Sequence, residues 1–161
     1  AALNPGRFCN GLVIPTNRTV TLNPGVYFID GTFEFKNNAA LTGTSGVTII
    51  LNSTPNFTVG NGVVLRLTAP TTGPTAGLAF VARPTLSGTV SVQNGAALVV
   101  EGAIYLPSMD ITFSGNSRTS GAQCTQLIAR RIIVTTSLNF QANCLASNIK
   151  AIGRSQPILA E

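Results

Sequence analysis

A repeat near the N-terminus limits the possible folds more than any other feature of this sequence. The stretch LNPGRFCNGLVI, residues 3–14, is followed shortly afterwards by the similar stretch LNPGVYFIDGTF, residues 22–33. Self-similarity at a period of about 20 residues is typical of architectures in which each structural unit stacks on the one before it. Unrelated hairpins would instead place turn signals at intervals of roughly 8–12 residues, without similarity at twice that length.

The repeat continues along the chain in a looser form, as short apolar runs that alternate with polar corners. Four asparagines mark these corners: Asn38, Asn61, Asn94 and Asn116. Their spacing is nearly even, except for a longer step between the second and the third. Asn and Gly both tolerate left-handed backbone angles, which suits them to tight corners. The long step contains APTTGPTAG, residues 69–77, which we interpret as a loop inserted into one coil.

The pattern therefore predicts an all-β chain with one domain, residues 1–161, folded as a right-handed parallel β-helix. We expect roughly seven coils of about 20–23 residues, each contributing two or three short strands. No stretch of about 12 residues or more has a helical period. Because the chain begins at Ala1 with a strand-like segment, we expect it to be a mature fragment or an excised domain of a longer protein.

Composition and charge exclude two classes of partner. No apolar run approaches the roughly 20 residues needed to span a bilayer, so we expect no membrane segment in this chain. The net charge is +5, but the basic residues are spread singly apart from Arg130–Arg131, aromatic residues are only 6% and Trp is absent. Nucleic-acid binding requires a basic face, preferably with aromatics for stacking, and we do not expect it here.

Catalytic chemistry is poorly supported by the residues present. Histidine is absent, which removes Ser-His-Asp triads, Cys-His pairs and most zinc sites. The acids are few and scattered: Asp30, Glu34, Glu101, Asp110 and Glu161. We therefore predict no calcium site, no cofactor and no catalytic residue. Asp30 and Glu34 would share the face of a regular strand about 13 Å apart, beyond the roughly 5–9.5 Å of glycosidase carboxylates. We expect Glu101 and Asp110 on different strands.

The three cysteines indicate one disulfide and one unpaired thiol. Cys124 and Cys144 are separated in the sequence by the length of one predicted coil, so stacking would bring them within bonding distance. We favour this disulfide, as a fastener of the C-terminal coil, over two buried thiols. Cys9 is left over, with an upstream partner in a longer protein as one explanation and a reactive thiol as a poorer one.

Several segments in the same order together resemble the C-terminal region of TadG-like proteins of bacterial Tad (Flp) pilus systems. They cover nearly the whole chain: LNPGVYFIDG, NAALTGTSGVTIIL, LTAPTTGPTAGLAF, GAIYLPSMDITFSGNS, CTQLIARRIIVTTSL and NCLASNIKAIG. The resemblance implies an extracellular or cell-envelope module that takes part in pilus assembly or surface attachment. It supplies no catalytic motif, and the family's N-terminal membrane anchor has no counterpart in these residues.

We therefore predict a non-enzymatic envelope module that docks to pilus or envelope proteins or binds surface glycans. The partner contacts are expected at the loop of residues 69–77 and at the corners around Arg83 and Arg118, because loops on a rigid scaffold commonly carry binding. Two other functions stay open: a carbohydrate-active enzyme on the same architecture, and a structural subunit whose coil ends stack between copies.

Overall fold

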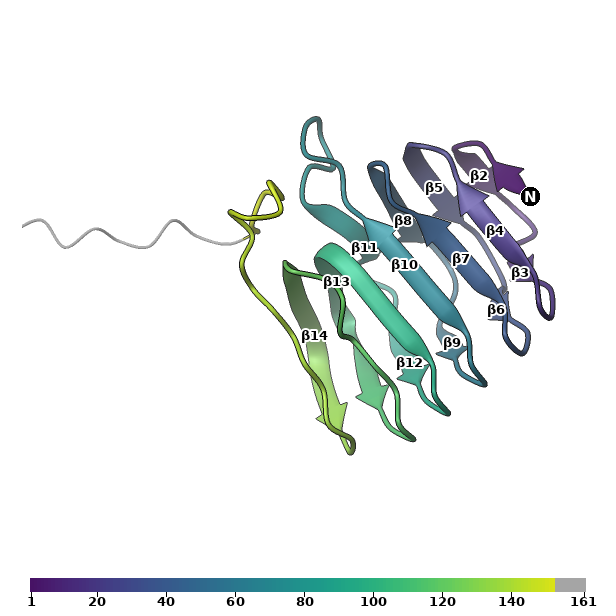
Figure 1. Ribbon diagram of the computed structural model, residues 1–161. Helices are drawn as coiled ribbons and strands as arrows, with labels where there is room; N and C mark the ends of the chain where they lie inside the picture. The colour runs from purple at the N-terminus through teal and green to yellow at the C-terminus, as the bar shows by residue number, and fades with distance from the viewer. Residues whose placement is uncertain (153–161) are drawn as a thin grey trace, which may run out of the picture.

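The computed structural model describes residues 1–152, which form an all-β solenoid of parallel strands with about six turns (Figure 1). This confirms the predicted parallel β-helix. The prediction of roughly seven coils is one too high, because the residues after Val134 add no further complete coil. They cross the end of the solenoid instead, and Ala142 pairs with Cys124 in an antiparallel bridge.

Each coil has three flanks, and equivalent strands of successive coils pair in parallel, except for β6 and β9. The first flank contains β1 (Ala2–Leu3), β4 (Thr19–Leu22), β7 (Ala40–Gly43), β10 (Val64–Thr68) and the start of β13 (Ala97–Phe113). The second contains β2 (Gly6–Phe8), β5 (Gly25–Ile29), β8 (Val47–Leu51), β11 (Leu78–Ala82), the middle of β13 and the first half of β14 (Thr125–Val134). The third contains β3 (Leu12–Ile14), β6 (Phe33–Phe35), β9 (Asn56–Val59), β12 (Gly88–Val92) and the ends of β13 and β14.

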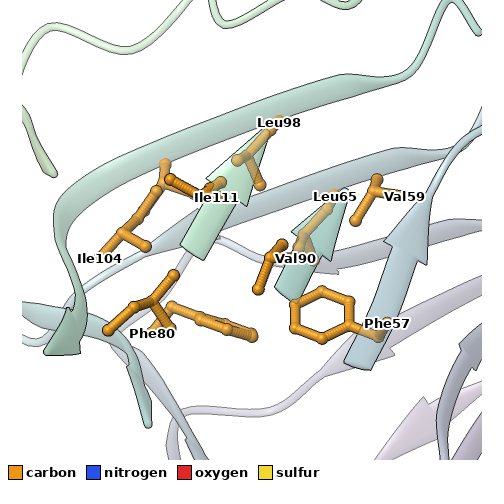
Figure 2. A pocket seen from close by; sticks show the side chains of 10 residues that line it. Phe57, Val59, Leu65, Phe80, Val90, Leu98, Ile104 and Ile111 are labelled. Carbon is orange, nitrogen blue, oxygen red and sulfur yellow. The ribbon is translucent and has the colours of Figure 1, made fainter. Parts of the chain in front are cut away.

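The core is a set of inward columns, because every second residue of a strand points into the solenoid. On the third flank, Phe57 pairs with Val90, which pairs with Ile111, and all three are buried. The interior encloses an apolar cavity of only about 10 Å³, lined by residues of this kind (Figure 2). A space of that size holds at most one water. The solenoid interior is therefore a packed core and no ligand site.

The predicted asparagine corners are confirmed by backbone geometry. Five corner asparagines have φ between 51° and 59°: Asn17, Asn38, Asn61, Asn94 and Asn116. The left-handed conformation is unfavourable for most residues, and Asn is one of the few that adopt it routinely. Asn94 also donates its side-chain amide to Asn61 Oδ1 at 3.3 Å, so neighbouring corners are linked through their side chains.

The repeated LNPG segments occupy the same corner of the first two coils. Asn23 donates its side-chain amide to Asn4 Oδ1 at 2.8 Å. Pro5 lies directly against Gly25, which has φ of 138°, and a Cβ on Gly25 would lie 2.4 Å from the Pro5 ring. Glycine is therefore required at position 25 for two reasons: the backbone angle, and the space that the stacked Pro5 ring occupies.

Gly25→Ala should destabilise the first two coils by about 1–3 kcal/mol, the usual cost of a strained backbone, plus the cost of the clash with Pro5. Gly73→Ala is the matched control, because Gly73 has φ of 85° but no atom within 4 Å of an added Cβ. Chemical denaturation of both variants measures the difference. Equal losses of unfolding free energy would show that the stacked proline is unimportant.

Candidate functional site

The two arginines predicted to contact a partner are exposed, and they lie at different corners. Arg83 follows the second flank, where its N–H donates to the Leu51 carbonyl at 3.2 Å. Arg118 begins the first flank of the last coil, where it bridges to Ala97. The structure therefore places Arg83 and Arg118 on separate parts of the surface.

Residues 69–77 connect β10 to β11, and the base of this loop is covered by the C-terminal segment. The Gly77 N–H closes the loop by donating to the Pro70 carbonyl at 2.8 Å. A Cβ on Gly77 would lie 2.1 Å from the Lys150 carbonyl oxygen, so the two backbones are in close contact. Only the tip of the loop, around Gly73, stands free in the described structure.

The acids of the described residues are engaged one by one with basic or backbone donors. Asp30 pairs with Arg7 and Glu34 pairs with Lys36. The Arg7 guanidinium donates a hydrogen bond to the Asp30 carboxylate and lowers its pKa. Asp30 follows β5 whereas Glu34 lies in β6, so the expectation that they share one regular strand is wrong. A corner at Gly31, with φ of 93°, separates them.

The expectation that Glu101 and Asp110 lie on different strands is also wrong, since β13 runs through both without interruption. They nevertheless belong to different flanks, because Glu101 pairs with Thr68 of the first flank and Asp110 with Thr89 of the third. Glu161 lies outside the described residues. Residues 1–152 contain no group of three or more Cys, Asp or Glu side chains that could hold a metal ion, and no helix long and apolar enough to cross a membrane.

One cleft interrupts the surface of the third flank, between β6 and β9. Its volume is about 300 Å³, and its lining combines aromatic, amide and hydroxyl groups with the Glu34 carboxylate. No ladder joins the two strands within the described chain. Ile29 pairs with Leu51 before this flank and Ala40 pairs with Val64 after it, so the later coil takes a longer path between equivalent positions. The extra length shifts β9 out of register with β6.

The cleft does not have the carboxylates of a glycosidase. Glu34 is the one carboxylate among the residues that line it, and that carboxylate is paired with the Lys36 ammonium. Glycoside hydrolysis usually requires two carboxyl groups that flank the scissile bond. The cleft therefore offers polar binding groups without the paired acid and base.

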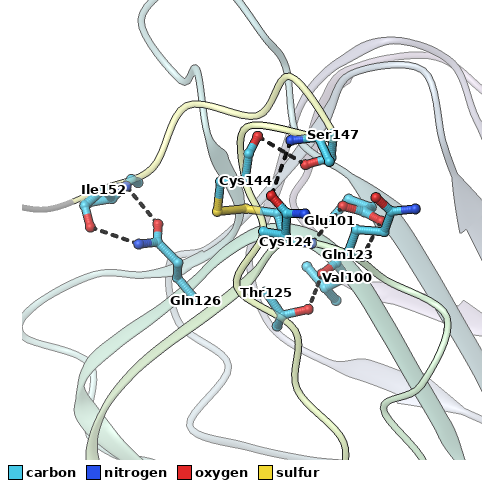
Figure 3. Close-up of a disulfide and its surroundings, with 11 residues drawn as sticks. Val100, Glu101, Gln123, Cys124, Thr125, Gln126, Cys144, Ser147 and Ile152 are labelled. Atoms are coloured by element: carbon cyan, nitrogen blue, oxygen red, sulfur yellow. Dashed lines mark hydrogen bonds between the residues drawn. A yellow bond between two sulfur atoms is a disulfide. The ribbon is translucent and has the colours of Figure 1, made fainter.

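The last coil is fastened by the predicted disulfide between Cys124 and Cys144, which is present with a Cα–Cα distance of 4.5 Å (Figure 3). The Glu101 carboxylate accepts hydrogen bonds from the backbone N–H groups of Gln123 and Cys124 at 2.6 and 3.1 Å. A disulfide is consistent with an oxidising compartment. Cys9 is exposed and has no disulfide partner among residues 1–152.

The C-terminal segment covers only the first part of the last coil. The Thr125 N–H donates outward to the Gln141 carbonyl at 2.7 Å, and the Gln126 side chain bonds both backbone groups of Ile152 (Figure 3). After Gln126, the only described strand that pairs with β14 is β13. Residues 127–134 of β14 therefore form an open edge, a name we use for this segment below.

Two inward columns of the core end at the open edge in exposed side chains. Ile132 continues the column of Ile111, and Val134 continues the column of Phe113. Ile111 and Phe113 are fully buried, but Ile132 and Val134 are 46% and 48% exposed. Six of the eight large hydrophobic side chains that are exposed in residues 1–152 lie at this end of the solenoid: Ile128, Ile132, Ile133, Val134, Phe140 and Leu145.

Positive charge accompanies this apolar edge. The Asp110 carboxylate accepts hydrogen bonds from Arg130 Nε at 2.8 Å and from an Arg131 terminal nitrogen at 2.9 Å. These bonds lower the pKa of Asp110 to about 2, although its partial burial opposes the shift. Two guanidinium groups share one carboxylate, so the cluster keeps a net positive charge and both arginines stay more than half exposed.

Sequence reasoning identified the pieces of this surface without recognising the surface. The run LIARRIIV is among the segments that carry the family resemblance, and the Arg130–Arg131 pair is the one break in an even charge distribution. The missed signal is position: this is the last apolar run before the polar segment that contains Cys144. The chain matches no family model, no curated protein and no solved structure.

Removing the disulfide with a Cys124→Ser/Cys144→Ser double variant should destabilise the last coil by about 3 kcal/mol, the loop-closure entropy for a loop of this length. Hydrogen exchange should show faster opening of residues 139–152 while the first coils stay protected. Cys9→Ser serves as the control and should leave both measurements unchanged. Uniform loss of protection along the chain would contradict a local fastener.

Asp110→Asn should remove an acid-dependent part of the stability. Because the folded-state pKa of Asp110 lies below its ordinary value of 3.8, the carboxylate stabilises the fold fully above about pH 4, and this contribution is lost as pH falls toward 2. The difference in unfolding free energy between the native chain and Asp110→Asn should therefore shrink over that range. Glu34→Gln, at a partly exposed carboxylate outside this cluster, is the control. A difference independent of pH would contradict the assignment.

Proposed function

We propose that this protein is a non-enzymatic module of the bacterial cell envelope or exterior, which docks to a component of a Tad-type pilus system through its last coil. The observation that carries the proposal is the open edge, where apolar side chains and two arginines are exposed on a solenoid whose middle coils bury most of their inward residues. Exposed apolar patches with a polar rim mark interaction sites on soluble proteins.

Four further observations support a passive role at an extracellular or envelope location. The disulfide fits an oxidising compartment, and the segments that resemble TadG-like proteins cover nearly the whole chain. The packed interior leaves no internal site for a substrate. The β6–β9 cleft, with its amide, hydroxyl and aromatic lining, fits binding of a surface glycan better than its cleavage. We assign the partner contact to the open edge and keep Arg83 and Arg118 as secondary candidates.

The docking role predicts a loss of pilus function when the open edge is made polar. Ile132→Thr/Val134→Thr keeps β-branched side chains and, because both residues are half exposed, should change the unfolding free energy by about 1 kcal/mol or less. In the source bacterium, this variant should reduce pilus display and surface attachment, measured by electron microscopy and by adherent cell counts. Val13→Thr is the matched control, because Val13 is 44% exposed at the opposite end.

The enzymatic alternative is tested with the purified chain. Incubation with pectin-like and other glycan polymers should release no reducing ends, although binding can occur. Measurable turnover that Glu34→Gln abolishes would overturn the proposal. Normal pilus display in the Ile132→Thr/Val134→Thr variant would remove the open edge as the docking site.

A further inference from the structure

We infer that the open edge binds its partner by β-strand addition, and that the partner supplies an extended segment in which apolar residues alternate with acidic ones. This inference rests on the proposed docking function and names its mode and the chemistry of the partner. In strand addition, an extended segment joins the free edge of a sheet, main-chain hydrogen bonds provide affinity and alternate side chains provide specificity.

The backbone of the open edge is available for such pairing. The Thr125 N–H is already bonded to Gln141 on the outward side, but beyond Gln126 the described chain supplies no outward strand. Alternate residues of a strand direct their backbone groups to opposite sides, so half of those in residues 127–134 point away from β13. Such unpaired edges are templates for another strand, and this one contains no proline. The irregularity in its pairing with β13 lies between Ala129 and Arg131, and Arg131–Val134 pair with β13 in continuous register.

The side chains of the open edge determine which residues an added strand requires. Its inward positions would lie on Ile132 and Val134, which now end the columns of Ile111 and Phe113, so these positions must be apolar. Leu138 and Phe140 cover part of the same end, with Phe140 packed edge-on against Phe113 at 5.8 Å. An apolar residue on the added strand would remove the exposed halves of two β-branched side chains from water, which favours binding.

The outward positions of an added strand would face guanidinium groups. Arg131 stands above Asp110 in the outward column of the third flank, and Arg130 lies beside it. Asp110 is shared by both arginines, so an acidic residue on the added strand would gain a partner in the same way that Asp110 does. Residues 111–152 contain four basic residues and no acid: Arg118, Arg130, Arg131 and Lys150. The whole end of the solenoid therefore favours an acidic partner.

Charge argues against a second copy of this chain as the occupant. Head-to-tail stacking would place the first coil on the last one, and residues 1–18 carry Arg7 and Arg18 but no acidic residue. Arg7 is paired with Asp30 of the second coil, whereas Arg18 has no ion pair among the described residues. Like charges would then meet at the junction, which disfavours the contact. Self-association through the open edge would therefore contradict the inference.

The test uses the oxidised full chain and a fluorescent peptide, as long as β14, that alternates valine with aspartate. We expect saturable binding, with amide chemical-shift changes in NMR spectra confined to the open edge and its neighbours on β13. A peptide with lysine in place of aspartate should bind about tenfold more weakly, and added salt should weaken the aspartate peptide. Ile132→Thr/Val134→Thr should weaken it about tenfold, whereas Val13→Thr should have no effect.

A charge exchange provides a second route that does not depend on the apolar variant folding. Arg131→Glu should weaken the aspartate peptide and strengthen the lysine peptide, while Asp110→Asn should tighten the aspartate peptide about twofold by releasing both arginines. Equal affinity for the two peptides in every variant would overturn the inference. Shift changes on the first coil, or sedimentation that shows self-association abolished by Ile132→Thr/Val134→Thr, would also overturn it.

Two outcomes separate this inference from the proposed function. If the apolar variant abolishes pilus display but no peptide binds the native chain, docking stands and strand addition is wrong. If the peptide binds as expected but the variant displays normal pili, the edge pairs strands and the pilus role is wrong. Binding by a chain ending at Ile152 but not by the full chain would overturn the inference for the native protein.

Discussion

The structure depends on the cover that each coil gives to the inward side chains of its neighbour. A strand as short as these has little stability alone, and its apolar residues are removed from water only when the equivalent residues of the next coil lie on them. Columns such as Phe57, Val90 and Ile111 are the result. The same requirement makes the ends special, because Ile132 has the side chain of a core residue and lacks the coil that would cover it.

The corners decide whether that stacking can continue when coil lengths differ. The path from Ala82 to Ala97 is longer than its equivalent in the previous coil, and a turn between Arg83 and Leu86 absorbs the excess, so that β12 still pairs with β9. In the coil before, a similar increase in length is not absorbed, so β6 and β9 lose their ladder and a polar cleft forms. The surface of the third flank is therefore continuous where a turn absorbs the extra residues, and it has a cleft where no turn does so.

Much of the fold could be predicted from the sequence, because its determinants are local and periodic. The corner asparagines have the left-handed backbone angles that were expected of them. The disulfide between Cys124 and Cys144 is present, but Cys144 reaches Cys124 on the segment that crosses the end of the solenoid, next to an antiparallel bridge, and not on a further stacked coil. The placement of charged groups was less accessible. Asp30 and Glu34 were assigned to one strand, but a corner at Gly31 separates them. A break inside a short segment depends on packing against the coils on either side, and periodicity does not report it.

The candidate site shows the same difference between features that the sequence predicts and features that depend on packing. The sequence by itself determined the coil and its corners, since both follow from residue types at a fixed spacing. Only the tertiary structure decided where stacking stops and which residues are left uncovered there. The segment after Val134 covers the start of the last coil and leaves Ile132, Val134 and the two arginines exposed. Exposure depends on what lies against a residue in space, and for these residues that contact comes from the path of the chain beyond them.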